Sequence, residues 1–306
     1  MEKRSVLHML DPMPNNSPFD VNMAIDAGFD VLVPYSNVKL DSVYGLTQDA
    51  IFSRGPSGVK RTALFIGGRD FGLAMDMLKA TGQAMVPPFE ISVLADPSGA
   101  FTTAAALVAC VEKQLRLHHQ RELKDCTAVV FGGTGPVGIT TGVIASLAGA
   151  KTILTDHLSS DTAEDVAKAY NRRFSATLTG ACARTDADKI ALLAEADIVF
   201  CTAKAGIQVL NAAVLKTTSQ LKVAGDVNAV PPLGIEGIQQ KDNGVALKYA
   251  ENAPGAVGIG ALAIGDVKYQ LQHQLLKAML ETSEPLSLDF RSAYEKAKDH
   301  RIILLK

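Results

Sequence analysis

The sequence predicts an α/β protein with parallel sheets, organised as two domains. Short runs of β-branched and apolar residues alternate with longer stretches of helical periodicity along almost the whole chain, which is the pattern of successive βαβ units. The length of 306 residues is typical of two domains. A hydrophobic content of 47% with 20% charged residues can build buried cores, so the composition excludes a disordered chain.

Four strands and two helices are expected in the first part of the chain. The strands are residues 5–9, 31–34, 62–66 and 91–94, and the helices are residues 19–27 and 70–81. A longer helical segment, residues 102–123, follows the turn sequence Asp96-Pro97-Ser98-Gly99. We place the domain junction on this helix, at residue 110.

The second part of the chain alternates more regularly. Strands are expected at residues 127–131, 152–155, 176–178, 197–201 and 221–224, with helices at residues 136–147, 162–173, 187–194 and 210–215. Enrichment in glycine and proline over residues 231–260 predicts loops around one strand near residues 244–249. Helices are expected again at residues 267–280 and 290–300. The predicted domains are residues 1–110, completed by the helices of residues 267–306, and residues 111–266.

Charge and cysteine content argue against several functional classes. The net charge of −2 and the pI of about 6.3 provide no basic face for nucleic acid and no polybasic segment for a lipid surface. The longest apolar stretches, such as residues 104–111, are shorter than the roughly 20 residues of a membrane helix. No signal peptide and no C-x-x-C pair is recognisable. We therefore expect a cytoplasmic protein without a metal site.

A glycine-rich segment follows the strand at residues 127–131 and opens the next helix. Its G-x-G-x-x-G spacing is carried by Gly133, Gly135 and Gly138. We expect Gly133 to allow a tight turn, Gly135 to admit a pyrophosphate, and Gly138 to let the helix approach the strand. The intervening residues of this turn are Thr134, Pro136 and Val137. The context predicts a Rossmann-type dinucleotide site, and the alternative is an ordinary glycine-rich turn.

An acidic residue ends the second strand of this domain. Asp156 lies 23 positions after Gly133, close to the spacing of about 20 expected for a carboxylate that binds the adenosine ribose. Such a carboxylate favours NAD over NADP, although Asp156 would also fit as a simple turn cap. His157 is a second candidate for the adenosine end. The small residue Ala203, after a later strand, suits close passage of the nicotinamide half.

Three further segments combine polar side chains with glycine or proline. Residues 96–103 open the interdomain helix, residues 222–235 follow a strand, and residues 258–268 enter a helix. Residue types alone leave two interpretations open for each segment, a ligand site or a local cap or surface position. The side chains concerned are Asp96, Thr102, Thr103, Asp226, Asn228 and Lys268.

Taken together, these segments resemble the bacterial NAD(P)-dependent methylene-tetrahydromethanopterin dehydrogenases of methylotrophs. The resemblance covers essentially the whole chain, and the sequence looks closest to the type dedicated to tetrahydromethanopterin. Its most specific parts are Asp-Val-Asn-Ala-Val-Pro-Pro and Gly-Ala-Leu-Ala-Ile-Gly-Asp-Val-Lys. The segments that carry it are residues 17–28, 65–68, 96–103, 131–138, 226–235 and 258–268.

The resemblance implies a reaction and an assembly. Methylene-tetrahydromethanopterin would pass a hydride to NAD(P)⁺ and become the methenyl cation, as a step of one-carbon (formaldehyde) oxidation. The pterin would bind in a cleft between the two domains, and the enzyme would be a homo-oligomer, a trimer or a hexamer. The NADP-linked relative of this family carries a Gly-Arg pair where this chain has Asp156-His157, a departure that supports NAD.

The resemblance also suggests roles for individual residues. Lys268 aligns with the family lysine implicated in the active site and is expected to orient the pterin. Asp20 would accept pterin N–H groups, because a carboxylate can take two at once, and Phe19 would supply an apolar wall. Weaker substrate-side candidates are Asp96, Thr102 and Thr103. Asp226 and Asn228 are expected on the cofactor side.

Two alternatives remain from the sequence. The first is a methylene-tetrahydrofolate dehydrogenase, with or without cyclohydrolase activity. The second, from another class, is a non-catalytic NAD(P)-sensing protein, which would keep the glycine-rich turn but would not need Lys268.

Overall fold

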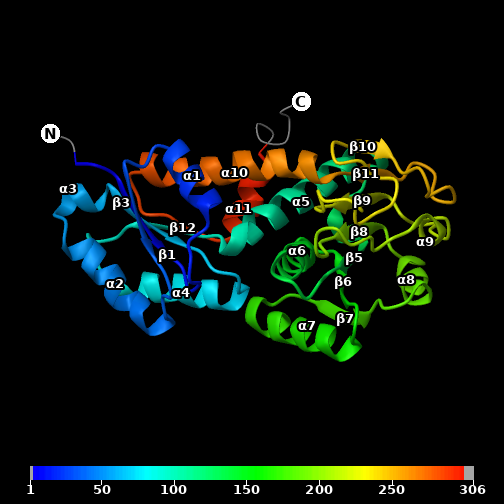
Figure 1. The fold of residues 1–306 in the computed structure, drawn as a ribbon, viewed down its shortest axis with the longest axis horizontal. Helices are drawn as coiled ribbons and strands as arrows, with labels where there is room; N and C mark the ends of the chain where they lie inside the picture. Colours follow the sequence, from blue (N-terminus) through cyan, green and yellow to red (C-terminus); the bar gives the residue numbers. More distant parts are fainter. Residues whose placement is uncertain (1–2, 300–306) are drawn as a thin grey trace. The chain divides into compact units, whose positions relative to one another are not determined.

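The computed structural model of the chain describes residues 3–299 and consists of two compact units (Figure 1). Within the described residues, unit 1 contains residues 3–102 together with Tyr269–Lys296, and unit 2 contains Thr103–Lys268 and residues 297–299. Two helices pass from one unit into the other: α5 (Ala100–Gln114) and α10 (Ala261–Glu281). The boundary on α5 therefore falls ahead of residue 110, where the sequence analysis places the junction.

Unit 1 is built on a five-stranded sheet in which every pairing is parallel. The order is β12-β4-β3-β1-β2, so the chain continues from β1 to one side and then returns to the other. In open α/β sheets, ligands bind beyond the carboxyl ends of the strands at such a reversal point. The strands are β1 (Val6–Leu10), β2 (Val31–Tyr35), β3 (Thr62–Ile66), β4 (Ser92–Ala95) and β12 (Ser287–Leu288).

Helices of unit 1 include one that the sequence analysis did not assign. This helix, α2 (Leu40–Phe52), buries Val43, Thr47, Ala50 and Ile51 at helical spacing, but its N-cap Lys39 makes no side-chain capping bond. Without a cap residue, its start carries no local signal. The other helices of this unit are α1 (Pro18–Asp26), α3 (Pro56–Val59), α4 (Phe71–Ala84) and α11 (Phe290–Ala297).

Three aromatic rings join segments of unit 1 that are distant in sequence. The ring centroid of Phe71, on α4, lies 4.8 Å from that of Phe101, on α5, and 5.1 Å from that of Phe290, on α11. All three rings are buried and meet edge to face, the favourable arrangement for aromatic pairs. Residues near the end of the chain thus complete the core of the first unit.

Unit 2 contains a seven-stranded sheet of order β10-β11-β9-β8-β5-β6-β7, parallel except for β10. The chain runs from β5 outward to β6 and β7, then returns to place β8 on the other side of β5. This is the Rossmann order, and its reversal lies between β5 and β8. The strands are β5 (Thr127–Phe131), β6 (Lys151–Asp156), β7 (Leu178–Cys182), β8 (Ile198–Cys201), β9 (Val223–Asp226), β10 (Asn243–Ala246) and β11 (Val257–Ile259).

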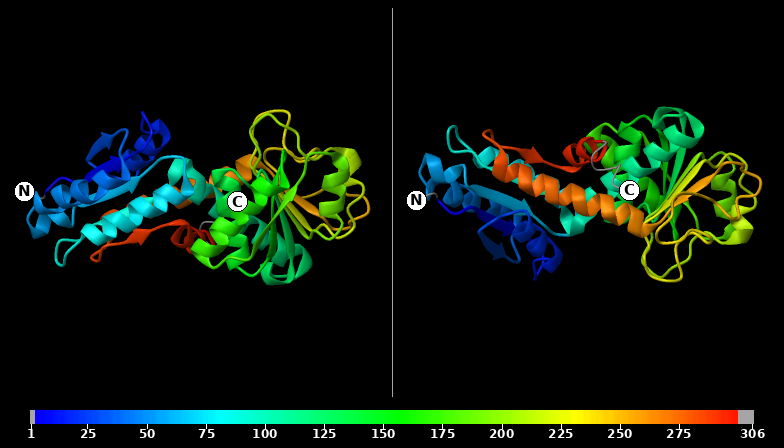
Figure 2. Two further views of the ribbon diagram at one scale, coloured as in Figure 1. Left: turned by 90° about the horizontal axis from the view of Figure 1, so that it is seen from below. Right: turned by 90° about the horizontal axis from the view of Figure 1, so that it is seen from above.

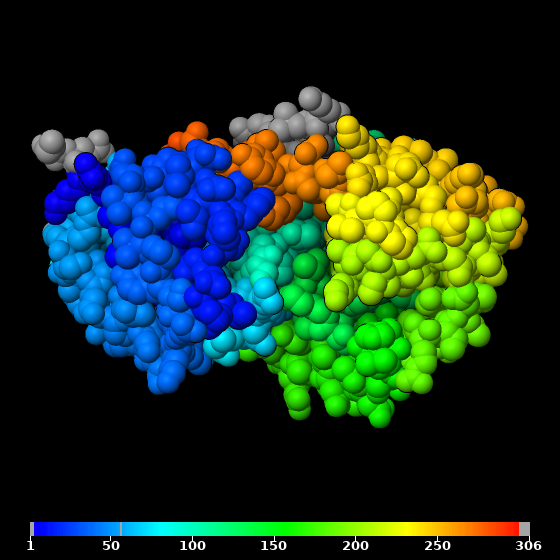
Figure 3. All heavy atoms as spheres, in the orientation of Figure 1, coloured from blue at the N-terminus to red at the C-terminus, as the bar shows by residue number. Residues whose placement is uncertain are grey.

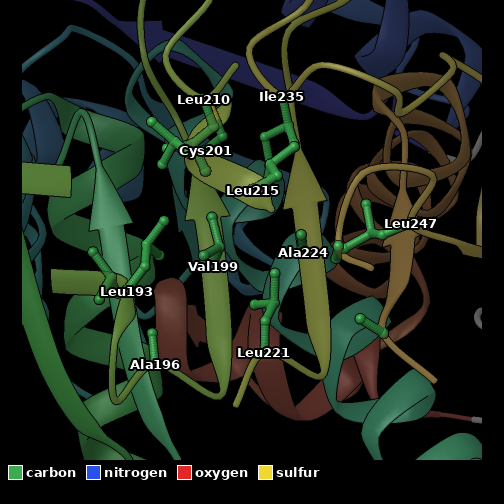
Figure 4. Close-up of a cluster of buried hydrophobic side chains, with 14 of the residues drawn as sticks. Leu193, Ala196, Val199, Cys201, Leu210, Leu215, Leu221, Ala224, Ile235 and Leu247 are labelled. Carbon is green, nitrogen blue, oxygen red and sulfur yellow. The ribbon is translucent and has the colours of Figure 1, made fainter. Parts of the chain in front are cut away.

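Helices cover both faces of this sheet. On one face, an added Cβ at Gly225 of β9 would lie 2.6 Å from a methyl carbon of Leu107, so α5 packs closely over that strand. On the other face, Val199 and Ala224 belong to a buried cluster with Leu193 and Leu215 (Figure 4). The remaining helices of this unit are α6 (Pro136–Leu147), α7 (Ser160–Phe174), α8 (Asp186–Leu193) and α9 (Ala212–Leu215).

Helix α10 is one continuous helix (orange in Figure 2) and begins at Ala261, six residues earlier than predicted. Part of this segment lies at the molecular surface (orange in Figure 3). Leu262 and Tyr269 are exposed side chains of the helix. Helix α11 ends at Ala297, and the predicted extension to His300 lies partly outside the described residues. Within residues 3–299, no helix is long and apolar enough to cross a membrane.

Two strand predictions in unit 2 are wrong. Strand β7 begins at Leu178 rather than at residue 176, because α7 continues to Phe174 and Ser175 turns the chain with a φ of 58°. Strand β11 lies in a segment that the sequence predicts as loops. Its three residues include a glycine and have no alternating pattern, so the sequence does not indicate a strand there. In contrast, β3, β5 and α6 have the predicted bounds.

Candidate functional site

The turn between β5 and α6 is shaped by four glycines. Gly132 has a φ of 73°, in the left-handed region, and a Cβ there would lie 2.7 Å from the backbone nitrogen of Ala203. Gly133 donates a hydrogen bond to the Thr155 carbonyl at 3.0 Å, and a Cβ on it would lie 2.7 Å from the Thr155 nitrogen. A Cβ at Gly138 would overlap the carbonyl oxygen of Gly132. These three positions are glycine because the chain packs against itself.

Gly135 is different, because its own chain leaves room for a side chain. A Cβ there would lie 3.5 Å from the Gly132 oxygen, an ordinary contact, and its φ of −81° is open to any residue. Gly135 is the N-cap of α6 and Pro136 follows at the first helical position, so no side chain caps the first turn. Backbone N–H groups at such a helix start suit a phosphate.

Asp156, at the end of β6, is bound to this turn. Its Oδ2 accepts a hydrogen bond from Thr134 Oγ1 at 2.9 Å, and its Oδ1 accepts from the backbone nitrogen of Leu158 at 2.8 Å. Burial acts to raise the pKa of this carboxyl, but the donated hydrogen bonds outweigh burial, so the net pKa lies below its ordinary value. The structure thus brings the predicted carboxylate beside the glycine-rich turn, with the exposed His157 next to it.

Ala203 follows β8 on the other side of the turn. The neighbouring Thr202 donates through Oγ1 to the Phe131 carbonyl at 2.9 Å, which fixes the end of β8 against the end of β5. Ala203 itself lies against Gly132 and is half-buried. It is the backbone of Ala203 that limits the space at Gly132, so this contact leaves the role of the small Ala203 side chain open.

Asp226 and Asn228 fold the loop that follows β9. The carboxylate of Asp226 accepts from the backbone nitrogens of Asn228 at 2.9 Å and Ile235 at 3.0 Å. The amide of Asn228 donates to the Pro232 carbonyl at 2.9 Å and accepts from the Gly206 nitrogen at 3.1 Å. Both residues are buried, and burial raises the pKa of the Asp226 carboxyl. These bonds favour a loop-shaping role for side chains that the sequence analysis assigned to the cofactor.

Asp96 and Thr102 bind each other at the start of α5. The Asp96 carboxylate accepts from Thr102 Oγ1 at 2.6 Å and from the backbone nitrogens of Phe101 and Thr102 at 2.9 and 3.1 Å. Neither residue has exposed surface, which favours the capping interpretation over contact with a substrate. Thr103, the next residue along α5, is half-buried and stays a candidate.

The buried carboxylate of Asp20 meets a buried amide. Asp20 lies in the first turn of α1, and its Oδ1 accepts a hydrogen bond from Gln272 Nε2, on α10, at 2.7 Å. Asp20 is 4% exposed and Gln272 has no exposed surface, whereas the adjacent Phe19 is 46% exposed. An exposed aromatic ring thus stands beside a buried acceptor, which is a combination suited to a planar, N–H-bearing ligand.

Lys268 lies on the same helix as Gln272, one turn earlier, and is half-buried. Gly265 lies a further turn back, and among residues 3–299 no atom outside its own stretch of helix backbone is within 4 Å of the position a Cβ would take. A glycine inside a helix weakens it by about 1 kcal/mol relative to alanine, and no described residue packed on this face explains that cost.

Comparison with known proteins decides the family. Residues 18–98 match the model of the N-terminal part of methylene-tetrahydromethanopterin dehydrogenase. The NAD(P)-dependent methylenetetrahydromethanopterin dehydrogenase of Methylorubrum extorquens strain AM1 is 45% identical over 294 residues, covering 96% of this chain and 98% of that protein. The chain belongs to the methylenetetrahydromethanopterin dehydrogenase family.

A second relative comes from the same strain, the bifunctional protein MdtA. It is 32% identical over 296 residues, covering 97% of this chain and 99% of that protein. Among solved structures, shikimate 5-dehydrogenase from Listeria monocytogenes in complex with shikimate and NAD is similar, with a TM-score of 0.47 and 12% identity. That likeness covers 95% of this chain and 96% of the other.

In this family member, sequence reasoning missed two notable residues. Gln272 is recognisable only as a glutamine on the buried stripe of an amphipathic helix. Asp11 follows β1 at the reversal point of the first sheet, where its Oδ1 accepts from the Met13 nitrogen at 2.8 Å. A Cβ at Gly67 would lie 2.6 Å from Asp11 Oδ2, and burial raises the pKa of the Asp11 carboxyl. The sequence feature that could have identified Asp11 is its position as a carboxylate directly after a buried strand.

Proposed function

We propose that this protein transfers a hydride from methylene-tetrahydromethanopterin to NAD(P)⁺, giving the methenyl cation and NAD(P)H. The observation that carries this proposal is the identity of 45% with the named dehydrogenase across 96% of the chain. The reaction balances without release of a proton, since the carbon gives up a hydride and keeps a positive charge. As the family resemblance implies, we expect this reaction to be a step of one-carbon (formaldehyde) oxidation.

The residues of unit 2 fit a nicotinamide dinucleotide. Space at Gly135 and the uncapped first turn of α6 suit its pyrophosphate, and Asp156 suits the ribose hydroxyls of the adenosine half. When bound, the nicotinamide ring supplies the hydride acceptor. We assign to the same cofactor site the other residues of the turn, which are Gly133, Thr134, Pro136, Val137 and Gly138. Asp156 supports a preference for NAD, because its pKa lies below the ordinary carboxyl value and its negative charge would repel a 2′-phosphate.

The substrate side is assigned to Asp20, Phe19 and Lys268. Asp20 would accept N–H groups of the pterin, with Gln272 holding its carboxylate in place at 2.7 Å. Phe19 would stack on the planar ring system. Lys268 would orient the substrate by hydrogen bonding, since a cation beside a developing cation stabilises it poorly. Because the carbon lies between two nitrogens that share the positive charge, no strong general base is required, and catalysis is mainly alignment.

The assembly and location follow from the family resemblance. We expect a homo-oligomer, a trimer or a hexamer, in the cytoplasm. Light scattering coupled to size-exclusion chromatography measures the molar mass directly. Three or six times the 32.3 kDa chain mass would support this expectation, and the mass of one chain or of any other multiple would contradict it.

A steady-state absorbance assay tests the activity. Methylene-tetrahydromethanopterin and methylene-tetrahydrofolate are each offered with NAD⁺ and with NADP⁺ to the wild type, to Lys268→Ala and to Lys277→Ala. Lys277 is the matched control, since it lies on the same helix but pairs with Glu281 at the surface. We expect turnover of the methanopterin derivative, faster with NAD⁺, with kcat/KM reduced at least about 100-fold in Lys268→Ala only.

Other results would change the assignment. Faster turnover of the folate derivative would make the protein a methylene-tetrahydrofolate dehydrogenase. Binding of NAD⁺ without turnover of either pterin would contradict the enzyme assignment and favour a nucleotide-sensing protein. Equal loss of activity in both lysine variants would contradict a specific role for Lys268.

A further inference from the structure

Arg184 lies just beyond the adenosine end of the proposed dinucleotide site. Strands β6 and β7 are parallel neighbours, with Asp156 in register with Cys182. The backbone nitrogen of Ala183 donates to the Asp156 carbonyl at 2.8 Å, which continues the pairing one residue beyond β7. The sheet therefore delivers Arg184, the next residue, to the edge at which Asp156 ends.

The side chain of Arg184 turns back toward Asp156. Its Nη2 donates to the carbonyl oxygen of Leu158, and the nitrogen of the same Leu158 donates to Asp156 Oδ1 at 2.8 Å. The guanidinium of Arg184 and the carboxylate of Asp156 thus bind the backbone carbonyl and the backbone nitrogen of the same residue in the loop after β6. Arg184 is exposed, and so is His157 in that loop.

From this geometry we propose that Arg184 is the residue that binds the 2′-phosphate of NADP, so that one site takes both dinucleotides. The inference rests on the proposed function, because it concerns the same cofactor. A ribose carrying two hydroxyls is held by Asp156. A ribose carrying a 2′-phosphate brings a dianion next to that carboxylate, and a guanidinium on the same loop offsets the repulsion.

The chemistry of the guanidinium suits this role. It has five N–H donors in a planar fork, so one contact with a carbonyl leaves donors for phosphate oxygens. Bonds of this kind between two charged groups are about twice as strong as neutral ones. Asp188 is a neighbouring acid, and the pKa of its carboxyl is lowered mainly by the hydrogen bonds from Thr185 and only in smaller part by the charge of Arg184. The side chain of Asp188 is already used, since it caps α8 through the Thr185 nitrogen at 2.8 Å.

Dissociation constants of the whole protein test the proposal without requiring turnover. NAD⁺ and NADP⁺ are titrated calorimetrically into the wild type, Arg184→Ala, Arg184→Lys and Arg172→Ala. Arg172 is the matched control, because it is exposed in the last turn of α7 and its loss changes the net charge equally. Adenosine 2′,5′-bisphosphate and AMP serve as fragment probes of the same end of the site. Thermal unfolding verifies that each variant is folded.

The expected result is a change in selectivity. The ratio of the dissociation constant for NADP⁺ to that for NAD⁺ should rise about tenfold or more in Arg184→Ala, and partly in Arg184→Lys. It should stay at the wild-type value in Arg172→Ala. Binding of adenosine 2′,5′-bisphosphate should weaken more than that of AMP.

Three outcomes would overturn the inference. They are an unchanged ratio in Arg184→Ala, an equal change in Arg172→Ala, and a wild type that binds NAD⁺ but not NADP⁺. In all three cases the proposed dehydrogenase activity with NAD⁺ still stands. A wild type that binds neither dinucleotide would overturn the proposed function together with this inference, so the two failures are distinguishable.

Discussion

At the scale of single residues, Gly135 and Gly138 lie in the same turn but are glycine for different reasons. The chain leaves space for a Cβ at Gly135, whereas a Cβ at Gly138 would overlap the backbone of Gly132. The second glycine is therefore explained by the fold, whereas the first is explained only if the proposed pyrophosphate binds there. Sequence spacing predicts both positions but does not separate their roles.

Substitution by alanine should separate the two roles. Gly135→Ala should leave the thermal unfolding midpoint within about 2 °C of the wild type and weaken dinucleotide binding at least about tenfold, since a methyl group displaces the phosphate. Gly138→Ala should lower the free energy of unfolding by about 1–3 kcal/mol, as overpacking does. Calorimetric titration and thermal unfolding measure both effects. Unchanged dinucleotide affinity in a folded Gly135→Ala would refute the phosphate assignment.

Carboxylates at strand ends show why sequence predicts a site only in part. Asp96, Asp156 and Asp226 each follow or end a strand, and the same residue types in the same positions suggested ligand contacts. In the structure all three accept backbone N–H groups, but Asp96 and Asp226 are buried, while Asp156 remains partly exposed. Burial therefore separates these roles, and burial is not encoded within a few neighbouring residues.

At the scale of elements, prediction works best where one pattern dominates. Strands β3 and β5 are continuous apolar runs that are buried in the sheet, and α6 begins at a glycine-proline pair, so their bounds are predicted correctly. Helix α2 has buried residues at helical spacing but no capping side chain to mark its start, and β11 has only three residues and no alternating pattern. Tertiary pairing rather than sequence pattern creates β11, through its parallel contact with β9.

Helix α10 allows a prediction at this scale. Gly265→Ala should raise the free energy of unfolding by about 0.5–1 kcal/mol, because alanine favours a helix and the structure offers no clash. If the pterin packs on the face of Lys268, the same methyl group should raise the KM for the pterin. Urea unfolding and steady-state kinetics measure the two effects. A more stable variant with an unchanged KM would place the pterin away from this face.

At the scale of the whole molecule, the fold depends on contacts that no local pattern reveals. Asp20 and Gln272 are hydrogen-bonded although 252 positions separate them, and Phe290 joins a core formed by Phe71 and Phe101. The sequence suggests that helices near its end complete the first unit. It does not suggest which side chain on those helices meets which carboxylate.

The contributions of two unit 2 carboxylates to the stability of the fold should change with pH in opposite directions. In the folded protein the pKa of Asp226 is raised above its ordinary value of 3.8. Its contribution to the free energy of unfolding is therefore fully present below pH 3.8 and is lost as pH rises through the folded pKa. The folded pKa of Asp156 is lowered, so its contribution is present above 3.8 and is lost as pH falls through the folded pKa.

Urea unfolding at a series of pH values, with Asp226→Asn and Asp156→Asn, measures these slopes. The stability of the wild type relative to Asp226→Asn should decrease as pH rises above 3.8. Its stability relative to Asp156→Asn should decrease as pH falls below 3.8. Parallel curves for the wild type and a variant would mean that the carboxyl concerned has the same pKa folded and unfolded.

Each of the two sheets has its own reversal point, between β1 and β3 in unit 1 and between β5 and β8 in unit 2. Each unit thus has an edge of the kind that binds ligands in open α/β sheets, with Asp11 and Gly67 at one and Gly135 and Asp156 at the other. In the proposed function, the dinucleotide is recognised at the edge of unit 2 and the pterin by other groups of the chain. A substitution in the glycine-rich turn should therefore weaken binding of the dinucleotide to the free protein and leave its binding of the pterin alone unchanged.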